Sequence, residues 1–325
     1  MLRTVELAVA DARAGGLDIA IRAVDDKEDE TVSREVAAAL VADPTVIAVI
    51  GHKNSGPSGA AGPIYAEAGL AQVTQCSTDN ALSRAGWPTF FRMCADNERQ
   101  AAVAAEFAHA RMPSASAVAV HDGTDYGRPL VQAFAARLEA LSGRSVTVLA
   151  MRVGQEDFSE IVEAIRDARA DIVDFGATEI ESSKLMRALH AAGLRAQVIS
   201  SEGGPDNPLA RLAGPAGEGS VHTYAGADPL ATPASRSLVR RCEAEIGETP
   251  SYVVECYDAV GVITAALEKG AVTRQEVRDA IASTDFEGIG GRIRFDAHGD
   301  RIDAPVSLWR VVSGRMVPLA ERALP

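Results

Sequence analysis

Short apolar runs alternate with longer amphipathic segments through most of the 325-residue chain. Residues 46–50 form one such run, and residues 97–111 form one of the longer segments. A short apolar run bounded by turn residues is typical of a buried strand, whereas apolar residues three and four positions apart are typical of a helix. Strands that alternate with helices favour parallel sheets covered by helices on both faces. The alternation therefore predicts an α/β fold.

The order of the predicted elements changes near residue 224. Before that point, strands are predicted over residues 17–23, 46–50, 70–74, 89–93, 117–120, 146–152, 172–175 and 197–200, and helices over 2–14, 31–42, 58–67, 97–111, 130–141, 158–168 and 182–192. After it, three successive helices are predicted over residues 234–246, 252–267 and 273–283, then a strand over 293–295 and a hairpin of 308–312 with 316–319. Helices that follow a second sheet indicate two lobes that exchange the chain more than once.

Charge and apolar content exclude several classes of function. Asp and Glu number 45 against 32 for Lys and Arg, so the net charge is −13 and nucleic acid is not an expected partner. The longest apolar stretches are shorter than the roughly 20 residues that span a bilayer. The chain shows no signal peptide after Met1, because it lacks a basic region followed by a long apolar core.

The cysteines and histidines predict no metal site. The four cysteines show no CxxC spacing, and the six histidines are scattered along the chain. Three disulfide pairings, or four free thiols, are all open for Cys76, Cys94, Cys242 and Cys256.

Five loops that follow predicted strands carry small and polar residues, over 51–58, 75–79, 121–127, 177–179 and 201–204. In open parallel sheets, ligands bind in such loops, beyond the carboxyl ends of the strands. Each loop alone also fits ordinary loop chemistry such as helix capping. Together the loops fit a zwitterion. Ser55, Thr78 and a helix N-terminus would hold a carboxylate, and Glu202 would neutralise an ammonium group, because a charge removed from water needs a partner.

Motifs for catalysis or nucleotide binding are not found. Residues 56–60 depart from G-x-S-x-G at the last position, and no Ser-His-acid order is legible. No G-x-x-x-x-G-K-[ST] sequence exists, and the acidic run 25–30 lacks the glycine and spacing of a calcium loop. We therefore expect neither an enzyme nor a cofactor.

A further set of motifs runs through nearly the whole chain. It comprises Val49-Ile50-Gly51-His52 with Ser55, Pro63-Ile64-Tyr65-Ala66-Glu67-Ala68-Gly69, Cys76-Ser77-Thr78 with Leu82, Phe91-Arg92, Val120-His121-Asp122 with Tyr126-Gly127, Asp157-Phe158-Ser159, Ala191-Ala192-Gly193-Leu194, Glu202-Gly203, Tyr257-Asp258-Ala259-Val260, and Phe295-Asp296 with Gly299-Asp300. In these motifs the chain resembles the type I periplasmic binding proteins of branched-chain amino acid ABC transporters, the leucine/isoleucine/valine-binding group.

The resemblance implies a fold of two doubly wound parallel-sheet lobes, joined by three crossovers, that close on an amino acid. It places residues 1–113 and 228–300 in lobe 1, and residues 114–227 and 301–325 in lobe 2. Members of the family begin with a signal peptide, a strand and a glycine-containing loop, none of which precedes Met1 here. We therefore expect the first strand of lobe 1 to be missing and the natural protein to begin upstream of Met1.

The resemblance also implies ligand-binding residues in lobe 1. Ser55 and Thr78 match the family positions that hold the carboxylate and ammonium groups of the ligand. Cys76 matches a position that contributes backbone, and Ser77 belongs to the same binding loop. Glu28 and Asn54 stand where some members carry a disulfide, so that bridge cannot form here.

In lobe 2 the resemblance implies three more binding residues. Tyr126 matches an aromatic position, and Glu202 matches the acid that pairs with the ligand ammonium. Thr178 stands where some members have a tyrosine.

The sequence is thus identified with an extracytoplasmic solute-binding protein, periplasmic or lipid-anchored, that delivers an aliphatic or other hydrophobic amino acid to the permease of an ABC importer. The alternative is a ligand-sensing regulatory domain of the same fold for an amino acid or amide. Fold alone does not separate these two functions.

Overall fold

The computed structural model describes residues 1–201, 203–205 and 207–319, and the chain forms two compact units. The first unit takes residues 1–96 and 225–305, and the second takes residues 97–224 and those from 306 onward. The chain thus passes between the units three times. The first passage comes before α5 (Asn97–Arg111), which packs against α6 (Gly127–Ser142) of the second unit. The boundary expected from the sequence lies later, after residue 113.

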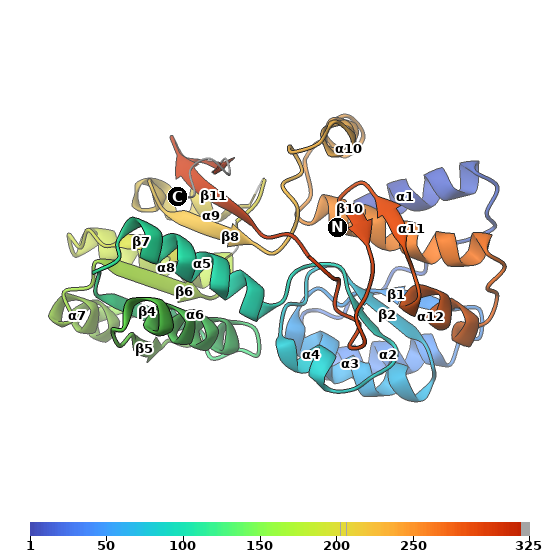
Figure 1. Cartoon of the computed structure of the whole chain (residues 1–325), viewed down its shortest axis with the longest axis horizontal. Coiled ribbons are helices and arrows are strands. Elements are labelled where there is room, and N and C mark those ends of the chain that lie inside the picture. Colours follow the sequence, from blue (N-terminus) through green and yellow to red (C-terminus); the bar gives the residue numbers. More distant parts are fainter. Residues whose placement is uncertain (202, 206, 320–325) are drawn as a thin grey trace. The chain divides into compact units, whose positions relative to one another are not determined.

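The first unit is built on a three-stranded parallel sheet in the order β1-β2-β3. Its strands are β1 (Ala48–Ile50), β2 (Ala71–Thr74) and β3 (Phe90–Arg92), and its longer flanking helices are α2 (Glu30–Val41), α3 (Ser55–Glu67), α11 (Val253–Glu268) and α12 (Arg274–Ala282). Tyr65 of α3 is buried with Leu40 of α2 on one side of the sheet. Val73 and Phe91 pack against α11 and α12 on the other side. Helices therefore cover both faces of this sheet (Figure 1).

The remaining elements of the first unit are α1 (Leu2–Ala14), α4 (Asn80–Arg84), α10 (Pro233–Glu245) and an antiparallel pair, β9 (Phe286–Gly288) with β10 (Gly291–Ile293). Helix α1 packs along α11. The guanidinium of Arg241 on α10 pairs with the carboxylate of Asp11 on α1, which also accepts a hydrogen bond from the hydroxyl of Tyr257. The first helix is therefore fixed to the late helices.

The second unit is built on a seven-stranded sheet in the order β12-β11-β8-β7-β6-β4-β5. The elements of this unit are α5, β4 (Ala117–His121), α6 (Gly127–Ser142), β5 (Thr147–Ala150), α7 (Ser159–Asp167), β6 (Ile172–Gly176), α8 (Glu179–Ala191), β7 (Gln197–Ser200), α9 (Leu209–Ala213), a 3-10 turn (Gly214–Gly217), β8 (Val221–Tyr224), β11 (Ser307–Val312) and β12 (Arg315–Pro318). The pairs from β5 to β8 are parallel, and β11 joins β8 and β12 in antiparallel register.

Alternate residues of the central strands fill two cores, because side chains of a strand point to opposite faces. Ala119 of β4 and Ile172 of β6 pack under α5 and α6. Val118 of β4 and Val173 of β6 pack under α7 and α8 on the other face. This arrangement is the α/β layering that the alternation of apolar runs predicts (Figure 1).

One predicted strand is not formed. Residues 17–23 belong to no strand and are mostly exposed, and β1 is an edge strand of its sheet among the described residues. A strand needs a neighbour for its backbone hydrogen bonds, and no described strand pairs with residues 17–23. The alternating pattern was therefore insufficient to predict a strand.

The described residues add two further observations. None of their helices has both the length and the apolar character needed to cross a bilayer.

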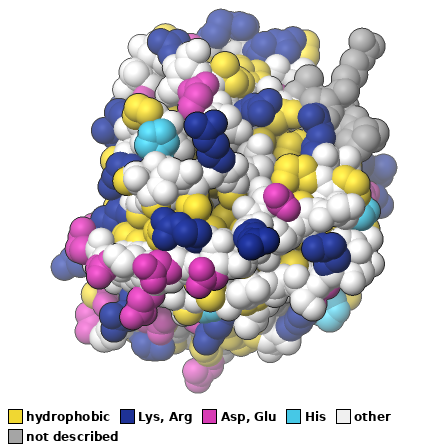
Figure 2. Space-filling model, turned by 90° about the vertical axis from the view of Figure 1, so that its left-hand side faces the viewer, with side chains coloured by type: hydrophobic (Ala, Val, Ile, Leu, Met, Phe, Trp, Pro, Cys, Tyr) yellow, Lys and Arg dark blue, Asp and Glu magenta, His cyan; other side chains and the backbone are white. Residues whose placement is uncertain are grey.

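Figure 2 shows Lys and Arg side chains spread over one face of the molecule, with most of the visible acidic side chains at its lower left. The net negative charge is therefore not uniform over the surface.

Candidate functional site

Two polar loops of the first unit lie at the same edge of its sheet. Residues 51–54 connect β1 to α3, and residues 75–79 connect β2 to α4. Since β1 and β2 are parallel neighbours, their carboxyl ends lie side by side. The structure therefore brings together the loops that carry Ser55, Cys76, Ser77 and Thr78.

Ser77 joins these two loops from the inside. Its side chain is fully buried, and its Oγ lies 2.7 Å from Oγ of Ser58 and 3.0 Å from the carbonyl oxygen of His52. Its backbone N–H donates to Oγ1 of Thr74. The hydroxyl of Ser77 is thus used within the fold, and any contact of Ser77 with a ligand falls to its main chain.

Ser55 and Thr78 have hydroxyl protons that no hydrogen bond among the described residues uses. Both side chains are buried, with exposed fractions of 4% and 2%. The Oγ of Ser55 accepts a hydrogen bond of 3.2 Å from the backbone N–H of Asp79, which leaves its own proton to donate. The Oγ1 of Thr78 has no hydrogen-bond partner in the described part of the chain. A buried hydroxyl without a partner is costly unless a ligand or water satisfies it.

The N-terminus of α3 adds further donors at this place. Ser55 is the first residue of α3, and the side chain of the N-cap residue Asn54 makes no capping hydrogen bond. The first backbone bond of the helix runs from Ser58 to Asn54, and Pro57 has no N–H. The amides of Ser55 and Gly56 therefore precede the first helical bond, where the helix dipole favours an anion.

Cys76 is half-buried beside these groups. Its Sγ lies 3.1 Å from the carbonyl oxygen of Lys53, in the loop after β1. None of the four cysteines forms a disulfide with another described residue. Burial raises the pKa of the Cys94 and Cys256 thiols, the latter to about 12, so these two remain protonated at neutral pH.

Arg92 was missed as a site residue, although it fixes the loop that contains Thr78. Its Nη1 donates to the carbonyl oxygens of Ser77 and Asp79, at 3.3 and 2.8 Å. These two carbonyls flank Thr78 in sequence. A charged residue at the end of a predicted apolar strand was the signal that could have identified it, because buried arginines are nearly always paired.

In the second unit, Tyr126 and Thr178 follow β4 and β6. Tyr126 precedes α6 and is partly packed against the core under α5 and α6. Gly127 follows it, where an added Cβ would lie 2.2 Å from the carbonyl oxygen of Gly176, so the helix starts in close contact with the end of β6. Strand β4 pairs with β6 in parallel, so both loops lie at one edge of the second sheet.

The hydroxyl of Thr178 is already used. Its Oγ1 donates to Oε2 of Glu181 over 2.6 Å, and the other oxygen of Glu181 accepts from the backbone N–H of Gly154. Burial alone would raise the pKa of Glu181, but these hydrogen bonds hold it below its ordinary value. Glu202, the predicted partner of a ligand ammonium, lies outside the described residues.

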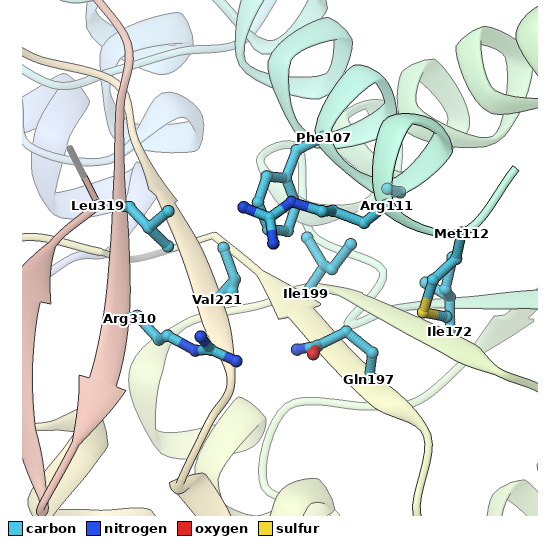
Figure 3. Close-up of a pocket in the computed structure, with 10 residues that line it drawn as sticks. Phe107, Arg111, Met112, Ile172, Gln197, Ile199, Val221, Arg310 and Leu319 are labelled. Atoms are coloured by element: carbon cyan, nitrogen blue, oxygen red, sulfur yellow. The ribbon is translucent and has the colours of Figure 1, made fainter. Parts of the chain in front are cut away.

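A cavity of about 250 Å³ lies at the amino ends of the parallel strands of the second sheet, whereas the loops that carry Tyr126 and Thr178 follow their carboxyl ends (Figure 3). Ile172, Gln197 and Val221, the first residues of β6, β7 and β8, contribute to its wall. Arg111 and Arg310 lie beside the apolar residues, as Figure 3 shows. Because this cavity is at the amino ends of the strands, none of the predicted site residues that the structure describes lines it.

The hydroxyls, helix amides and loop positions of the first unit suit a carboxylate, and no described cluster of three or more His, Cys, Asp or Glu could hold a metal ion. A family model described as periplasmic binding protein matches residues 1–315.

Similar proteins and structures extend the comparison. The Leu/Ile/Val-binding protein homolog 1 of Brucella melitensis is 32% identical over 292 residues, which are 88% of this chain and 78% of that protein. The Leu/Ile/Val-binding protein homolog 2 of Brucella abortus is 32% identical over 95% of this chain and 85% of its own length. The crystal structure of the leucine-binding protein LivK from Thermotoga maritima superimposes with a TM-score of 0.89 at 25% identity, over 98% of this chain and 93% of that one.

The expected fold and family are thus confirmed, and the chain belongs to the periplasmic binding protein family, among the type I proteins related to the branched-chain amino acid binders.

Proposed function

We propose that this protein is an extracytoplasmic solute-binding protein that delivers an aliphatic or other hydrophobic L-α-amino acid to an ABC importer. It has no chemistry of its own in this proposal. The observation that carries the proposal is the buried hydroxyl of Thr78, which has no hydrogen-bond partner among the described residues. It lies in the loop whose Asp79 amide donates to Ser55 at the start of α3. Relatives named for leucine, isoleucine and valine binding support the choice of ligand.

Each proposed contact has a chemical reason. Ser55 and Thr78 donate hydrogen bonds to the α-carboxylate, and the amides at the start of α3 add their dipoles. Tyr126, Thr178 and Glu202 are binding residues of the second unit in this proposal, Thr178 through its main chain because its hydroxyl donates to Glu181. Glu202 supplies the countercharge of the ammonium group, and Cys76 contributes its backbone.

The direct test is a thermal-shift screen of the twenty amino acids and small amides. A ligand at 100 times its dissociation constant adds about 2.7 kcal/mol to the free energy of unfolding. We expect the largest shifts with leucine, isoleucine or valine. No shift with any amino acid, or a shift only with an amide or an acidic ligand, would contradict the proposed ligand class.

A matched pair of variants assigns the shift to the proposed site. The double variant Ser55→Ala/Thr78→Val removes both hydroxyls and should abolish most of the leucine-induced shift. Thr31→Val is the control, because Thr31 is exposed in the first turn of α2. Equal shifts in both variants would place the ligand elsewhere.

Transport can be tested in cells. Deleting the gene should reduce uptake of the amino acid that binds in the screen, and the gene for Thr31→Val should restore uptake. If the gene for Ser55→Ala/Thr78→Val restored uptake to the same level, transport would not depend on binding at this site.

A further inference from the structure

Arg92 has a fully buried side chain in the first unit, outside the set of residues expected to touch a ligand. It ends β3, the strand next to β2. A buried guanidinium is stable only when its donors are matched, so the partners of Arg92 show what it holds in place.

The guanidinium has five N–H groups, and it makes four hydrogen bonds and one further close ion-pair contact. Nη1 donates to the carbonyls of Ser77 and Asp79 on either side of Thr78, and Nη2 donates to Oγ of Ser83. Nε donates to Oδ1 of Asp300 over 2.8 Å, and Nη2 lies 2.6 Å from the same oxygen. One side chain therefore connects the Thr78 loop with Asp300.

Asp300 belongs to the return segment (residues 299–301), which runs beside β3 just before the chain leaves the first unit. The backbone N–H of Arg92 donates to the carbonyl of Gly299, and the N–H of Arg301 donates to the carbonyl of Arg92. A Cβ at Gly299 would lie 1.9 Å from the carbonyl oxygen of Phe90, and its φ of +81° also favours glycine. The return segment is therefore held against β3 at a distance that fixes the Asp300 carboxylate.

We propose that Arg92 is a positioning residue that makes the conformation of the Thr78 loop depend on Asp300 of the return segment. The guanidinium orients the carbonyls that flank Thr78, and Asp300 keeps the guanidinium in place. The effect on affinity rests on the proposed function, whereas the effect on the loop does not. A lysine in place of Arg92 would keep the charge but supply three donors in place of five, so it would not hold both carbonyls, Ser83 and Asp300 together.

Hydrogen exchange of the ligand-free protein tests the effect on the loop. In Asp300→Asn, the amides of residues 76–80 should exchange at least tenfold faster than in the wild type, although residue 300 is distant in sequence. Asp285→Asn is the matched control, since Asp285 pairs with Arg292 in the same unit but both side chains are exposed. Exchange of residues 76–80 should be unchanged in this control.

Affinity is measured on the same proteins by calorimetry with the amino acid found in the screen, well below their melting temperatures. Asp300→Asn and Arg92→Lys should raise the dissociation constant about tenfold, and Asp285→Asn should not. If Arg92→Lys folds, its amides of residues 76–80 should also exchange faster than in the wild type. If it does not fold, Asp300→Asn alone tests the proposal.

Unchanged exchange of residues 76–80 in folded Asp300→Asn would overturn the proposal. Faster exchange with an unchanged dissociation constant would contradict the proposed effect of Arg92 on ligand affinity. If the wild type binds no amino acid, the proposed function fails, and the exchange result still decides the role of Arg92.

Discussion

The loops at the strand ends of the two units are held by different groups. In the first unit, Arg92 from a neighbouring strand binds the carbonyls around Thr78, and the Thr78 hydroxyl has no partner in the part of the chain that the structure describes. In the second unit, Thr178 donates to Glu181, only three residues along the chain. Thr124 likewise donates to Asp122 of its own loop, over 2.6 Å. The loop held by Arg92 leaves the hydroxyl of Thr78 for a ligand, whereas the loops of the second unit use the hydroxyls of Thr124 and Thr178 in their own hydrogen bonds.

The comparison predicts a division of roles. The first unit should supply directional hydrogen bonds to a carboxylate, and the second unit should supply charge and shape. The following experiments test this division, in order of decreasing expected effect.

Removing the predicted charge of the second unit should have the largest effect. Glu202→Gln should weaken amino-acid binding by about 2 to 5 kcal/mol, because a buried ammonium would lose its full countercharge. Calorimetry measures the change. Glu163→Gln, an exposed position on α7, is the control and should bind as the wild type does. Wild-type affinity in Glu202→Gln would assign the ammonium to another group.

Buried carboxyl groups make the first unit sensitive to pH. Burial raises the pKa of Glu255 to about 7, although its Oε1 accepts a hydrogen bond from the backbone N–H of Ala227. The folded protein favours the protonated form of Glu255. The contribution of this group to the free energy of unfolding is therefore complete below the unfolded-state pKa, about 4.3, and is lost as the pH rises through about 7.

Glu255→Gln should therefore become more stable relative to the wild type by about 2 to 3 kcal/mol between pH 5 and pH 8. Urea unfolding at the two pH values gives this difference. The same comparison for Glu163→Gln should show little change with pH. A constant difference for Glu255→Gln would mean that Glu255 ionises at its ordinary pKa in the folded protein.

Thr78 should affect affinity without affecting stability. Thr78→Val should raise the dissociation constant roughly fivefold, about 1 kcal/mol, while the melting temperature of the free protein stays the same or rises, since no internal hydrogen bond is lost. Ser77→Ala gives the opposite case, because its hydroxyl bonds lie within the fold, so its melting temperature should fall. A lower melting temperature in Thr78→Val would reveal an internal partner.

Thr178 should give the smallest change in binding. Thr178→Val removes the hydrogen bond to Glu181 and should lower the unfolding free energy by about 1 kcal/mol. Its dissociation constant should change less than twofold if the hydroxyl is used internally. If the dissociation constant changed as much as in Thr78→Val, the hydroxyl of Thr178 would contact the ligand. The proposed difference between the two units would then be wrong.

Much of the fold could be predicted from the sequence, because apolar periodicity is a local signal. The helix over residues 97–111 and the buried strand over 172–175 are found with nearly the predicted bounds. The short helices α4 and α9 and the strand β9 were not predicted, because elements of three to five residues leave almost no periodicity. Residues 17–23 show the reverse error, an alternating pattern without a pairing partner.

The candidate site was predictable only in outline. The loops that follow β1 and β2 meet as parallel topology requires, so Ser55 and Thr78 could be grouped from the sequence. The different roles of Ser77 and Thr78 could not be predicted from the sequence. Two adjacent hydroxyl residues have the same chemistry, and only the backbone conformation decides which side chain bonds within the fold. The pairing of Arg92 with Asp300 depends on a contact across 208 positions, which no local pattern encodes.

That separation also bears on how the protein is made. A ribosome adds about 5 to 20 residues per second, so the carboxylate of Asp300 emerges roughly 10 to 40 s after the guanidinium of Arg92. Until then, the nascent first sheet would contain a buried arginine without its counterion, and β3 would lack the partner that its last residue has in the folded unit. The uninterrupted stretch 97–224 of the second unit has no such dependence on Asp300. Synthesis therefore favours a folding order in which most of the second unit forms before the first unit is complete.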